Sequence, residues 1–246
     1  MMRDKNHAGK TLEPLGGGYF AAVAGVHRFG TDAVLLADFA APKSSKRLCD
    51  LCAGCGIVSL LWCASQPDAR RWIDAFEIQR DAVDLIEYSA QFNHFDGLHG
   101  IEADLRTLGG SFTGAYDLVA CNPPYTKAGT GPVSRVDTAR TARHELLCTL
   151  EEVVVCGARL LRNGGRFCLC HRPERLAELF FLMRQYGVEP KRLRFVQQRT
   201  DTRPWLILVE GKKGGRAGLV AEPTLLVEDV DGTYSSEMRK IYQKLE

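Results

Sequence analysis

The stretch with the clearest chemical potential is Asn122-Pro123-Pro124-Tyr125, which follows a run of apolar residues. The Asn122 side chain and the Pro123 carbonyl each offer an oxygen that can accept a hydrogen bond from an amino group. Two such acceptors would stabilise the positive charge that develops when a conjugated amine attacks a carbon atom. Proline fixes its backbone angle and has no N–H to compete, and Tyr125 offers a ring on which a flat acceptor can stack. A tight turn is the alternative interpretation, but the two prolines alone would suffice for that. We therefore take Asn122, Pro123, Pro124 and Tyr125 as candidate catalytic residues.

A second motif, Asp50-Leu51-Cys52-Ala53-Gly54-Cys55-Gly56, lies where an apolar run meets a helical pattern. Glycines at such a turn let a ligand approach the backbone closely. Glu77 ends the next apolar run, about 20 residues on, and is placed to bind ribose hydroxyls. Asp104 follows the third run and can accept a hydrogen bond from an adenine amino group. These residues predict a nucleotide cofactor, with a packing turn and a surface carboxylate as alternatives. Ser59 stands where a pyrophosphate fingerprint favours a smaller residue, so NAD and S-adenosylmethionine both remain open.

The cysteines and the apolar runs set further expectations. Cys49, Cys52 and Cys55 have a spacing that can ligate a metal, but Cys49 falls inside a predicted strand and no fourth ligand is suitably spaced. We predict no metal site. The N-terminus, Met1 to His7, has no apolar stretch and no run of eighteen apolar residues occurs, so we expect a cytoplasmic protein with no membrane partner and no disulfides among its nine cysteines.

The elements that must position these motifs alternate between short apolar runs and helical periodicity, which is typical of βαβ units. Predicted strands cover residues 47–51, 72–77, 99–103, 116–121 and 166–171. Two more, 191–197 and 205–209, are joined by a turn too short for a crossover helix, so they should pair antiparallel. The expected fold is α/β, Rossmann-like and of the class I S-adenosylmethionine-dependent methyltransferase type. Its mostly parallel seven-stranded sheet ends in an antiparallel terminal hairpin.

Size and charge fit one domain. The chain has 246 residues, of which 45% are hydrophobic and 25% charged, enough for a single well-filled core over residues 1–246. We expect segment 1–43 to contribute to the cofactor site, 126–143 to form a flexible basic loop, and 219–246 to be peripheral. The net charge of +2 permits contact with nucleic acid without requiring it. Basic residues cluster at 135–143, 191–203 and 212–216, where ordinary solvated loops are an equally good interpretation.

Three further stretches support a resemblance: Arg28 to Ala37, Ala142-Arg143-His144-Glu145, and Arg172 to Leu176. With the Asn122 to Tyr125 turn, they make the chain resemble amino-group methyltransferases, and more narrowly the tRNA adenine-N6 methyltransferases that act next to a valine tRNA anticodon. The resemblance covers most of the chain and implies S-adenosylmethionine as cofactor and tRNA as partner. It places Thr31 and Asp32 near the methionine end of the cofactor, and Cys52 where relatives usually carry glycine. The candidate cofactor-binding residues are then Thr31, Asp32, Asp50, Cys52, Gly54, Gly56, Glu77 and Asp104.

An RNA acceptor would need cations beside the pocket, and the candidates for holding phosphates are Lys127, Arg135, Arg140 and Arg143. Similar enzymes methylate guanine amino groups in ribosomal RNA or a glutamine amide in release factors, so these acceptors remain alternatives. An NAD-dependent oxidoreductase would leave the Asn122 turn without a role. A non-catalytic RNA-binding module is a further alternative. The sequence leaves the oligomeric state and the particular tRNA open.

Overall fold

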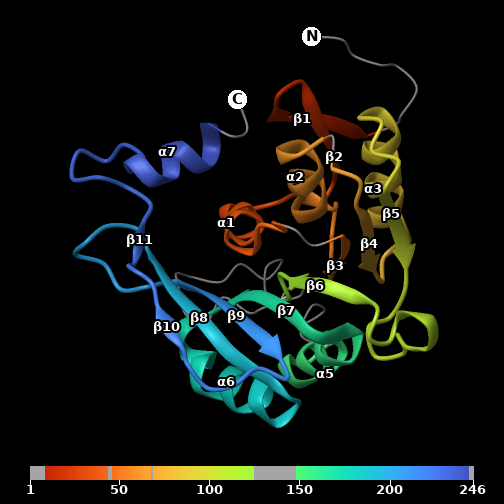
Figure 1. Cartoon of the computed structure of the whole chain (residues 1–246). Helices are drawn as coiled ribbons and strands as arrows, with labels where there is room; N and C mark the ends of the chain where they lie inside the picture. The colour runs from red at the N-terminus through yellow and green to blue at the C-terminus, as the bar shows by residue number, and fades with distance from the viewer. Residues whose placement is uncertain (1–8, 44–45, 68, 125–147, 244–246) are drawn as a thin grey trace, which may run out of the picture.

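The computed structural model describes residues 9–43, 46–67, 69–124 and 148–243 (Figure 1). The predicted loop at 126–143 lies outside the described residues. So do the catalytic candidate Tyr125 and the phosphate-binding candidates Lys127, Arg135, Arg140 and Arg143.

One large sheet forms the centre of the molecule, with strand order β10-β8-β9-β7-β6-β3-β4-β5 and with β11 also paired to β8. The strands from β5 across to β7 run parallel, whereas β9 runs antiparallel to both β7 and β8. The predicted mostly parallel sheet and its antiparallel terminal hairpin are therefore confirmed. The seven long strands are β3 (Arg47–Leu51), β4 (Trp72–Glu77), β5 (Leu98–Glu102), β6 (Tyr116–Cys121), β7 (Leu161–His171), β8 (Val188–Gln197) and β9 (Leu206–Lys213).

Among the described residues the sheet has nine strands and not seven, because the C-terminal segment adds β10 (Val220–Ala221) and β11 (Leu225–Leu226) to the edge strand β8. Helix α7 (Ser236–Gln243) follows them, and its Met238 and Ile241 are buried in the core. This segment is thus held by backbone pairing and by apolar packing.

Helices cover both faces of the sheet (Figure 1). One face packs against α1 (Thr31–Ala40), α2 (Ile57–Ser65) and α3 (Arg80–Phe92), and the other against α5 (Leu150–Leu160) and α6 (Leu176–Gln185). Strand residues alternate between these two cores, since successive side chains of a strand point to opposite faces. None of the helices described is long and apolar enough to cross a bilayer.

An N-terminal hairpin, β1 (Lys10–Gly16) and β2 (Tyr19–Ala24), forms a separate two-stranded sheet that the sequence did not lead us to expect. It is fastened to α3 and the turn after it. The Asn93 side chain accepts a hydrogen bond from the Phe20 amide at 2.9 Å and donates one to the Phe20 carbonyl at 2.6 Å. The Ser89 hydroxyl accepts from the Ala22 amide at 2.9 Å. The chain therefore enters α1 from a fixed direction.

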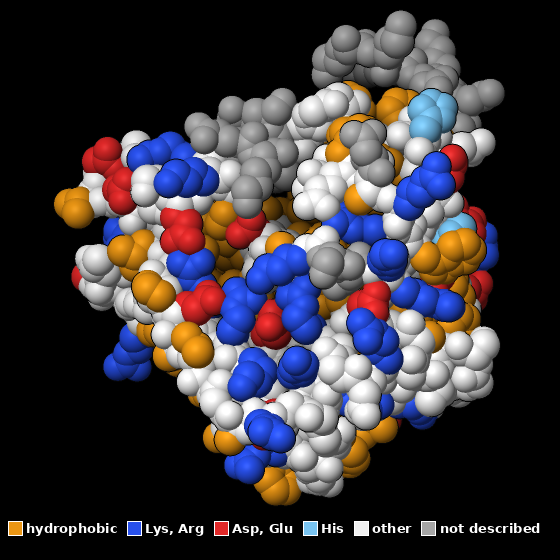
Figure 2. All heavy atoms as spheres, in the orientation of Figure 1, with side chains coloured by type: hydrophobic (Ala, Val, Ile, Leu, Met, Phe, Trp, Pro, Cys, Tyr) orange, Lys and Arg blue, Asp and Glu red, His pale blue; other side chains and the backbone are white. Residues whose placement is uncertain are grey.

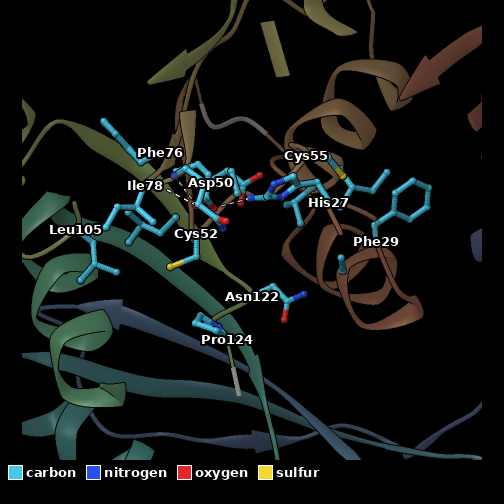
Figure 3. Close-up of a pocket in the computed structure, with 18 of the residues that line it drawn as sticks. His27, Phe29, Asp50, Cys52, Cys55, Phe76, Ile78, Leu105, Asn122 and Pro124 are labelled. Carbon is cyan, nitrogen blue, oxygen red and sulfur yellow. Dashed lines mark hydrogen bonds between the residues drawn. The ribbon is translucent and has the colours of Figure 1, made fainter. Parts of the chain in front are cut away.

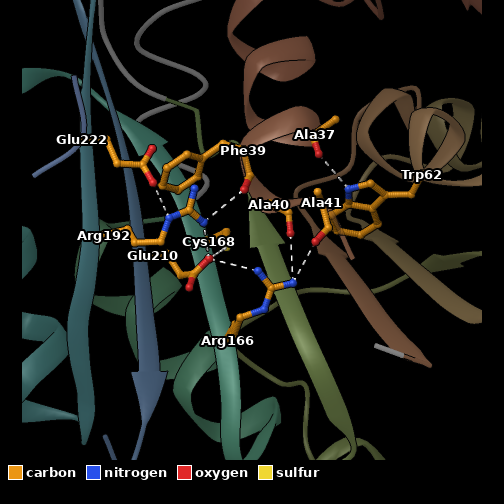
Figure 4. A network of polar contacts seen from close by, with 10 residues as sticks. All are labelled: Ala37, Phe39, Ala40, Ala41, Trp62, Arg166, Cys168, Arg192, Glu210 and Glu222. Atoms are coloured by element: carbon orange, nitrogen blue, oxygen red, sulfur yellow. Dashed lines mark hydrogen bonds and ion pairs between the residues drawn. The ribbon is translucent and has the colours of Figure 1, made fainter. Parts of the chain in front are cut away.

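The far end of α1 is held by a network of charges (Figure 4). Arg166 donates to the carbonyls of Ala40 at 3.1 Å and Ala41 at 2.9 Å. Glu210 accepts from Arg166 at 3.0 Å and from Arg192 at 2.8 Å. Cations at a helix C-terminus interact favourably with its dipole and its unpaired carbonyls. The network therefore fixes the helix whose first turn carries Thr31 and Asp32.

The basic cluster at 191–203 is partly neutralised by neighbouring carboxylates. Figure 2 shows Lys and Arg side chains gathered over the region of β7, β8 and β9 with acidic side chains among them. Arg192 also pairs with Glu222 at 2.6 Å, and Arg194 pairs with Glu237 at 2.7 Å. Because these arginines already form ion pairs within the protein, a structural role is favoured for them over contact with a polyanion.

Candidate active site

A cavity of about 320 Å³ lies at the carboxyl ends of β3, β4 and β6 (Figure 3). Ligands bind at this edge in open α/β sheets, because the loops that follow the strands converge there. The structure places eight of the predicted residues in the wall of the cavity: Asp32, Asp50, Cys52, Gly54, Glu77, Asp104, Asn122 and Pro124. Thr31, Gly56 and Pro123 are not in the wall.

Glu77 holds the glycine turn in place. One of its oxygens accepts a hydrogen bond from the Gly54 amide at 3.0 Å, and the other accepts from the amides of Ile78 at 2.9 Å and Gln79 at 3.1 Å. Only 7% of the residue is exposed, so the alternative of a surface carboxylate is wrong. Because a carboxylate oxygen has two lone pairs, the one bonded to Gly54 can also accept a hydroxyl from a ligand in the cavity.

Asp50 lies beneath the first turn of α2 and is 1% exposed. It accepts hydrogen bonds from the Ser59 amide at 3.2 Å and from the Ser59 hydroxyl at 2.9 Å. Burial, with a smaller contribution from the charge of Glu77, raises the pKa of Asp50 to about 7, although the Ser59 hydrogen bonds oppose the shift. The Asp50 carboxyl group therefore accepts the hydrogen bond of the Ser59 amide in the first turn of α2. Amides at such a helix terminus are the groups that a pyrophosphate would bind. This arrangement suits a cofactor without phosphates.

The two glycines of the turn serve different purposes. A Cβ atom on Gly54 would meet no other atom within 4 Å, so this residue presents open backbone to the cavity. A Cβ atom on Gly56 would lie 2.8 Å from Cγ1 of Ile86, so Gly56 is required for close packing against α3. Both residues have positive φ angles, +55° and +79°. Gly56 thus supports the turn from behind without lining the cavity.

Cys52 has the backbone conformation that a glycine would adopt. Its φ angle is +56°, in the left-handed region that costs an ordinary residue about 1–2 kcal/mol. Its thiol hydrogen-bonds with those of Cys121 and Cys148, and the first of these contacts contributes most to raising the pKa of Cys52. All nine cysteines carry free thiols. Among the residues described, no group of three His, Cys, Asp or Glu side chains is arranged to hold a metal ion.

The turn after β6 brings Asn122 and Pro124 into the wall of the cavity, where they lie below Asp50 and Cys52 in the view of Figure 3. The two prolines end the strand because neither can donate to the ladder. Oδ1 of Asn122 accepts a hydrogen bond from the thiol of Cys170 on β7, with Sγ and Oδ1 3.0 Å apart. An amide oxygen is thereby held next to the cavity.

Two predicted residues lie at the margin of this site. Asp104 is hydrogen-bonded to Nε of Arg106 at 2.9 Å, and that contact lowers the pKa of Asp104, which is therefore ionised at neutral pH. The Thr31 hydroxyl is 3.5 Å from the Tyr242 hydroxyl of α7, which links the C-terminal segment to the start of α1.

His27, Ile78 and Leu105 are among the wall residues that reasoning from sequence missed. His27 follows the hairpin and pairs with Asp81 at 2.9 Å, and Ile78 and Leu105 provide apolar surface beside Phe76, on the side of the cavity away from His27 (Figure 3). The position of Ile78 directly after Glu77 is the one signal that could have indicated its role. His27 and Leu105 carry no such signal.

A family model described as the methyltransferase small domain matches residues 29–173, more than half of the chain. The chain belongs to this family. A tRNA1(Val) (adenine(37)-N6)-methyltransferase of a Flavobacteriaceae bacterium (strain 3519-10) is 31% identical to this methyltransferase over 183 residues, covering 68% of the chain and 75% of the relative. One of Dickeya chrysanthemi (strain Ech1591) is 26% identical over 220 residues, covering 87% of the chain and 85% of the relative.

Among solved structures, a protein from Agrobacterium tumefaciens described as a predicted O-methyltransferase is similar with a TM-score of 0.70 at 19% identity. The match covers 87% of this chain and 96% of that one, and it supports the fold. Family membership, together with a cavity lined by acidic side chains, identifies S-adenosylmethionine as the cofactor. The NAD-dependent alternative is thereby excluded.

Proposed function

We propose that this methyltransferase transfers the methyl group of S-adenosylmethionine to the exocyclic N6 of an adenine in tRNA, next to the anticodon. The observation that carries the proposal is the position of Asn122: its amide oxygen stands in the wall of the same cavity as Glu77 and Asp32. The names of the relatives support the choice of acceptor, since they are tRNA adenine-N6 methyltransferases.

The cofactor would be held by residues on both sides of the glycine turn. Glu77 accepts hydrogen bonds from the ribose hydroxyls, and Ile78 and Leu105 give an apolar slot for the adenine ring. Asp32 lies toward the methionine end, where its carboxylate favours a cationic cofactor. When bound, the cofactor supplies an electrophilic methyl group on a sulfonium.

The acceptor would be activated by the turn after β6. Oδ1 of Asn122 and the Pro123 carbonyl accept hydrogen bonds from the two N–H groups of the adenine amine, while Pro124 and Tyr125 lie against the base. These acceptors stabilise the charge that appears on nitrogen as it attacks, and the proton leaves to water after transfer. No strong base is needed, because in-line attack depends mainly on positioning.

The phosphates of the nucleic acid would be bound by four basic side chains, those of Lys127, Arg135, Arg140 and Arg143. A base in a loop is unstacked at lower cost than a paired one, so an anticodon loop is a suitable substrate. Phosphate contacts release counterions, and tRNA affinity should therefore fall steeply with salt. A tRNA acceptor also favours a cytoplasmic location, which is part of this proposal.

The decisive experiment combines the purified protein, S-adenosylmethionine and unmodified total tRNA, followed by mass spectrometry of the nucleosides. We expect N6-methyladenosine, and we expect Asn122→Ala to abolish it while cofactor binding by calorimetry persists. Methylation of guanine in ribosomal RNA or of glutamine in a protein, with tRNA left unmodified, would assign one of the alternative acceptors. Retention of full activity by Asn122→Ala would refute the role of this turn.

A further inference from the structure

The thiol of Cys170 is the group that touches the Asn122 amide from within the fold. Strands β6 and β7 run parallel with Cys121 opposite Leu169, so the next residue pair along the two strands is Asn122 and Cys170. Residues in register on neighbouring strands point to the same face. Cys170 lies in the core on the α1 face, and α1 contributes Asp32 to the cavity. The sheet register therefore brings Cys170, Asn122 and Asp32 together.

Cys170 is held inside the sheet, whereas Asn122 lies just beyond the end of its strand. Cys170 is fully buried, and its strand pairs with β6 on one side and β9 on the other, where Cys170 is opposite Leu208. Asn122 follows the last paired residue of β6 and precedes two prolines. Within the part of the chain that the structure describes, the contact with Cys170 at 3.0 Å is the one hydrogen bond found for the Asn122 side chain.

The direction of this hydrogen bond follows from the state of the thiol. Burial, reinforced by the nearby carboxylate of Asp32, raises the pKa of Cys170 well above its usual range. The thiol thus keeps its proton and donates it toward Oδ1. An amide oxygen has two lone pairs, so one remains for a second donor.

We propose that Cys170 is a positioning residue for methyl transfer: its thiol takes one lone pair of Asn122 Oδ1 and so turns the other toward the acceptor amine. The inference rests on the proposed function, because it assigns Asn122 the contact with that amine. It adds to that function the residue that orients the acceptor oxygen before the substrate arrives.

Two substitutions separate hydrogen bonding from packing. Cys170→Val fills a similar volume without a donor, whereas Cys170→Ser keeps a donor and gives up apolar volume. We expect Cys170→Val to lower kcat by about three- to tenfold, the usual worth of one modest hydrogen bond, while KM for S-adenosylmethionine stays within about twofold. Cys170→Ser should keep kcat within about twofold of the unsubstituted protein.

The matched control is Cys168→Val. Cys168 lies two residues earlier on the same strand and the same face, is equally buried, and its thiol is directed to Glu210 at 3.7 Å and not to Asn122. Cys168→Val should leave kcat unchanged. Full kcat in Cys170→Val, or an equal loss in Cys170→Ser, would overturn the inference.

A second readout does not depend on the acceptor. In nitrogen-15 NMR spectra, we expect Cys170→Val to shift or broaden the Asn122 side-chain amide resonance, which is assigned by its loss in Asn122→Ala, while Cys168→Val leaves it in place. An unchanged resonance in Cys170→Val would overturn the inference. If the unsubstituted protein fails to methylate tRNA, the proposed function fails, and this spectrum still decides the role of Cys170.

Discussion

The buried carboxyl group of Asp50 should make the stability of the protein depend on pH in a defined window. Its pKa is raised by burial from 3.8 to about 7, so the folded protein holds a proton at pH values where the unfolded chain has released it. The stability contributed by this group is fully present below about pH 4 and is lost as pH rises toward 7. The difference in pKa corresponds to on the order of 4 kcal/mol.

Asp50→Asn tests this directly. Asparagine keeps an oxygen for the amide and hydroxyl of Ser59, which both donate to the same Asp50 oxygen, and it cannot ionise. We expect the free energy of unfolding of Asp50→Asn, relative to the unsubstituted protein, to rise by about 1.4 kcal/mol per pH unit between pH 5 and 7 and to level off above.

Urea unfolding of both proteins at half-unit steps from pH 5 to 8 measures the difference. Other titrating groups contribute equally to both proteins and cancel. Two parallel curves of stability against pH would show that Asp50 ionises inside the fold at no cost, and the reasoning from burial would then be wrong.

Four other substitutions have distinct expected outcomes. Gly54→Ala should weaken S-adenosylmethionine binding at least tenfold in calorimetry and lower the free energy of unfolding by about 1 kcal/mol. Gly56→Ala should lower the free energy of unfolding by about 2–3 kcal/mol, because its Cβ meets Ile86. Equal losses of stability in the two variants would contradict this reasoning. Glu77→Gln should raise the cofactor Kd by about tenfold or more, since one oxygen of the carboxylate is lost; an unchanged Kd would remove Glu77 from the cofactor site. Glu210→Ala should lower stability by about 2–3 kcal/mol in urea unfolding, because two partly buried arginines lose their shared partner; no loss would show that solvent screens them.

Much of the central sheet could be predicted from periodicity because buried parallel strands and amphipathic helices leave strong patterns. Strand β6 was predicted at its observed bounds, Tyr116–Cys121. The spacing Thr149-x-x-Glu152 is typical of a capping box, and in the structure these two side chains bond to each other's backbone amides at the start of α5. These features depend on neighbours in the sequence, which is why sequence alone is enough.

Features that depend on distant contacts were less accessible. The Asn-Gly-Gly stretch at 163–165 is typical of a helix end, yet α5 ends at Leu160 and this stretch lies within β7. The hairpin of β1 and β2 was missed because its stability comes from α3, far along the chain.

The residues of the candidate site also differ in whether the sequence alone could predict their roles. Eight residues of its wall, most of them acidic or in the turns after strands, could be predicted because loops after parallel strands meet at one edge of a sheet. The separate task of Gly56 could not, since only the packing of α2 against α3 reveals it. Nothing in the sequence marks Cys170, because its contact with Asn122 exists only once β6 and β7 are in register.

The N-terminal hairpin has a practical consequence for anyone who shortens this chain. The family model begins at residue 29, so a truncation to that boundary would discard β1, β2 and His27. The side chains of Asn93 and Ser89 would lose their hydrogen bonds to the backbone of β2, and the surface of α3 that β2 covers would be exposed to water. A trimmed protein of this kind should be prone to aggregate and should bind nucleotide analogues poorly, so crystallisation or screening efforts ought to retain everything from Lys10 onward.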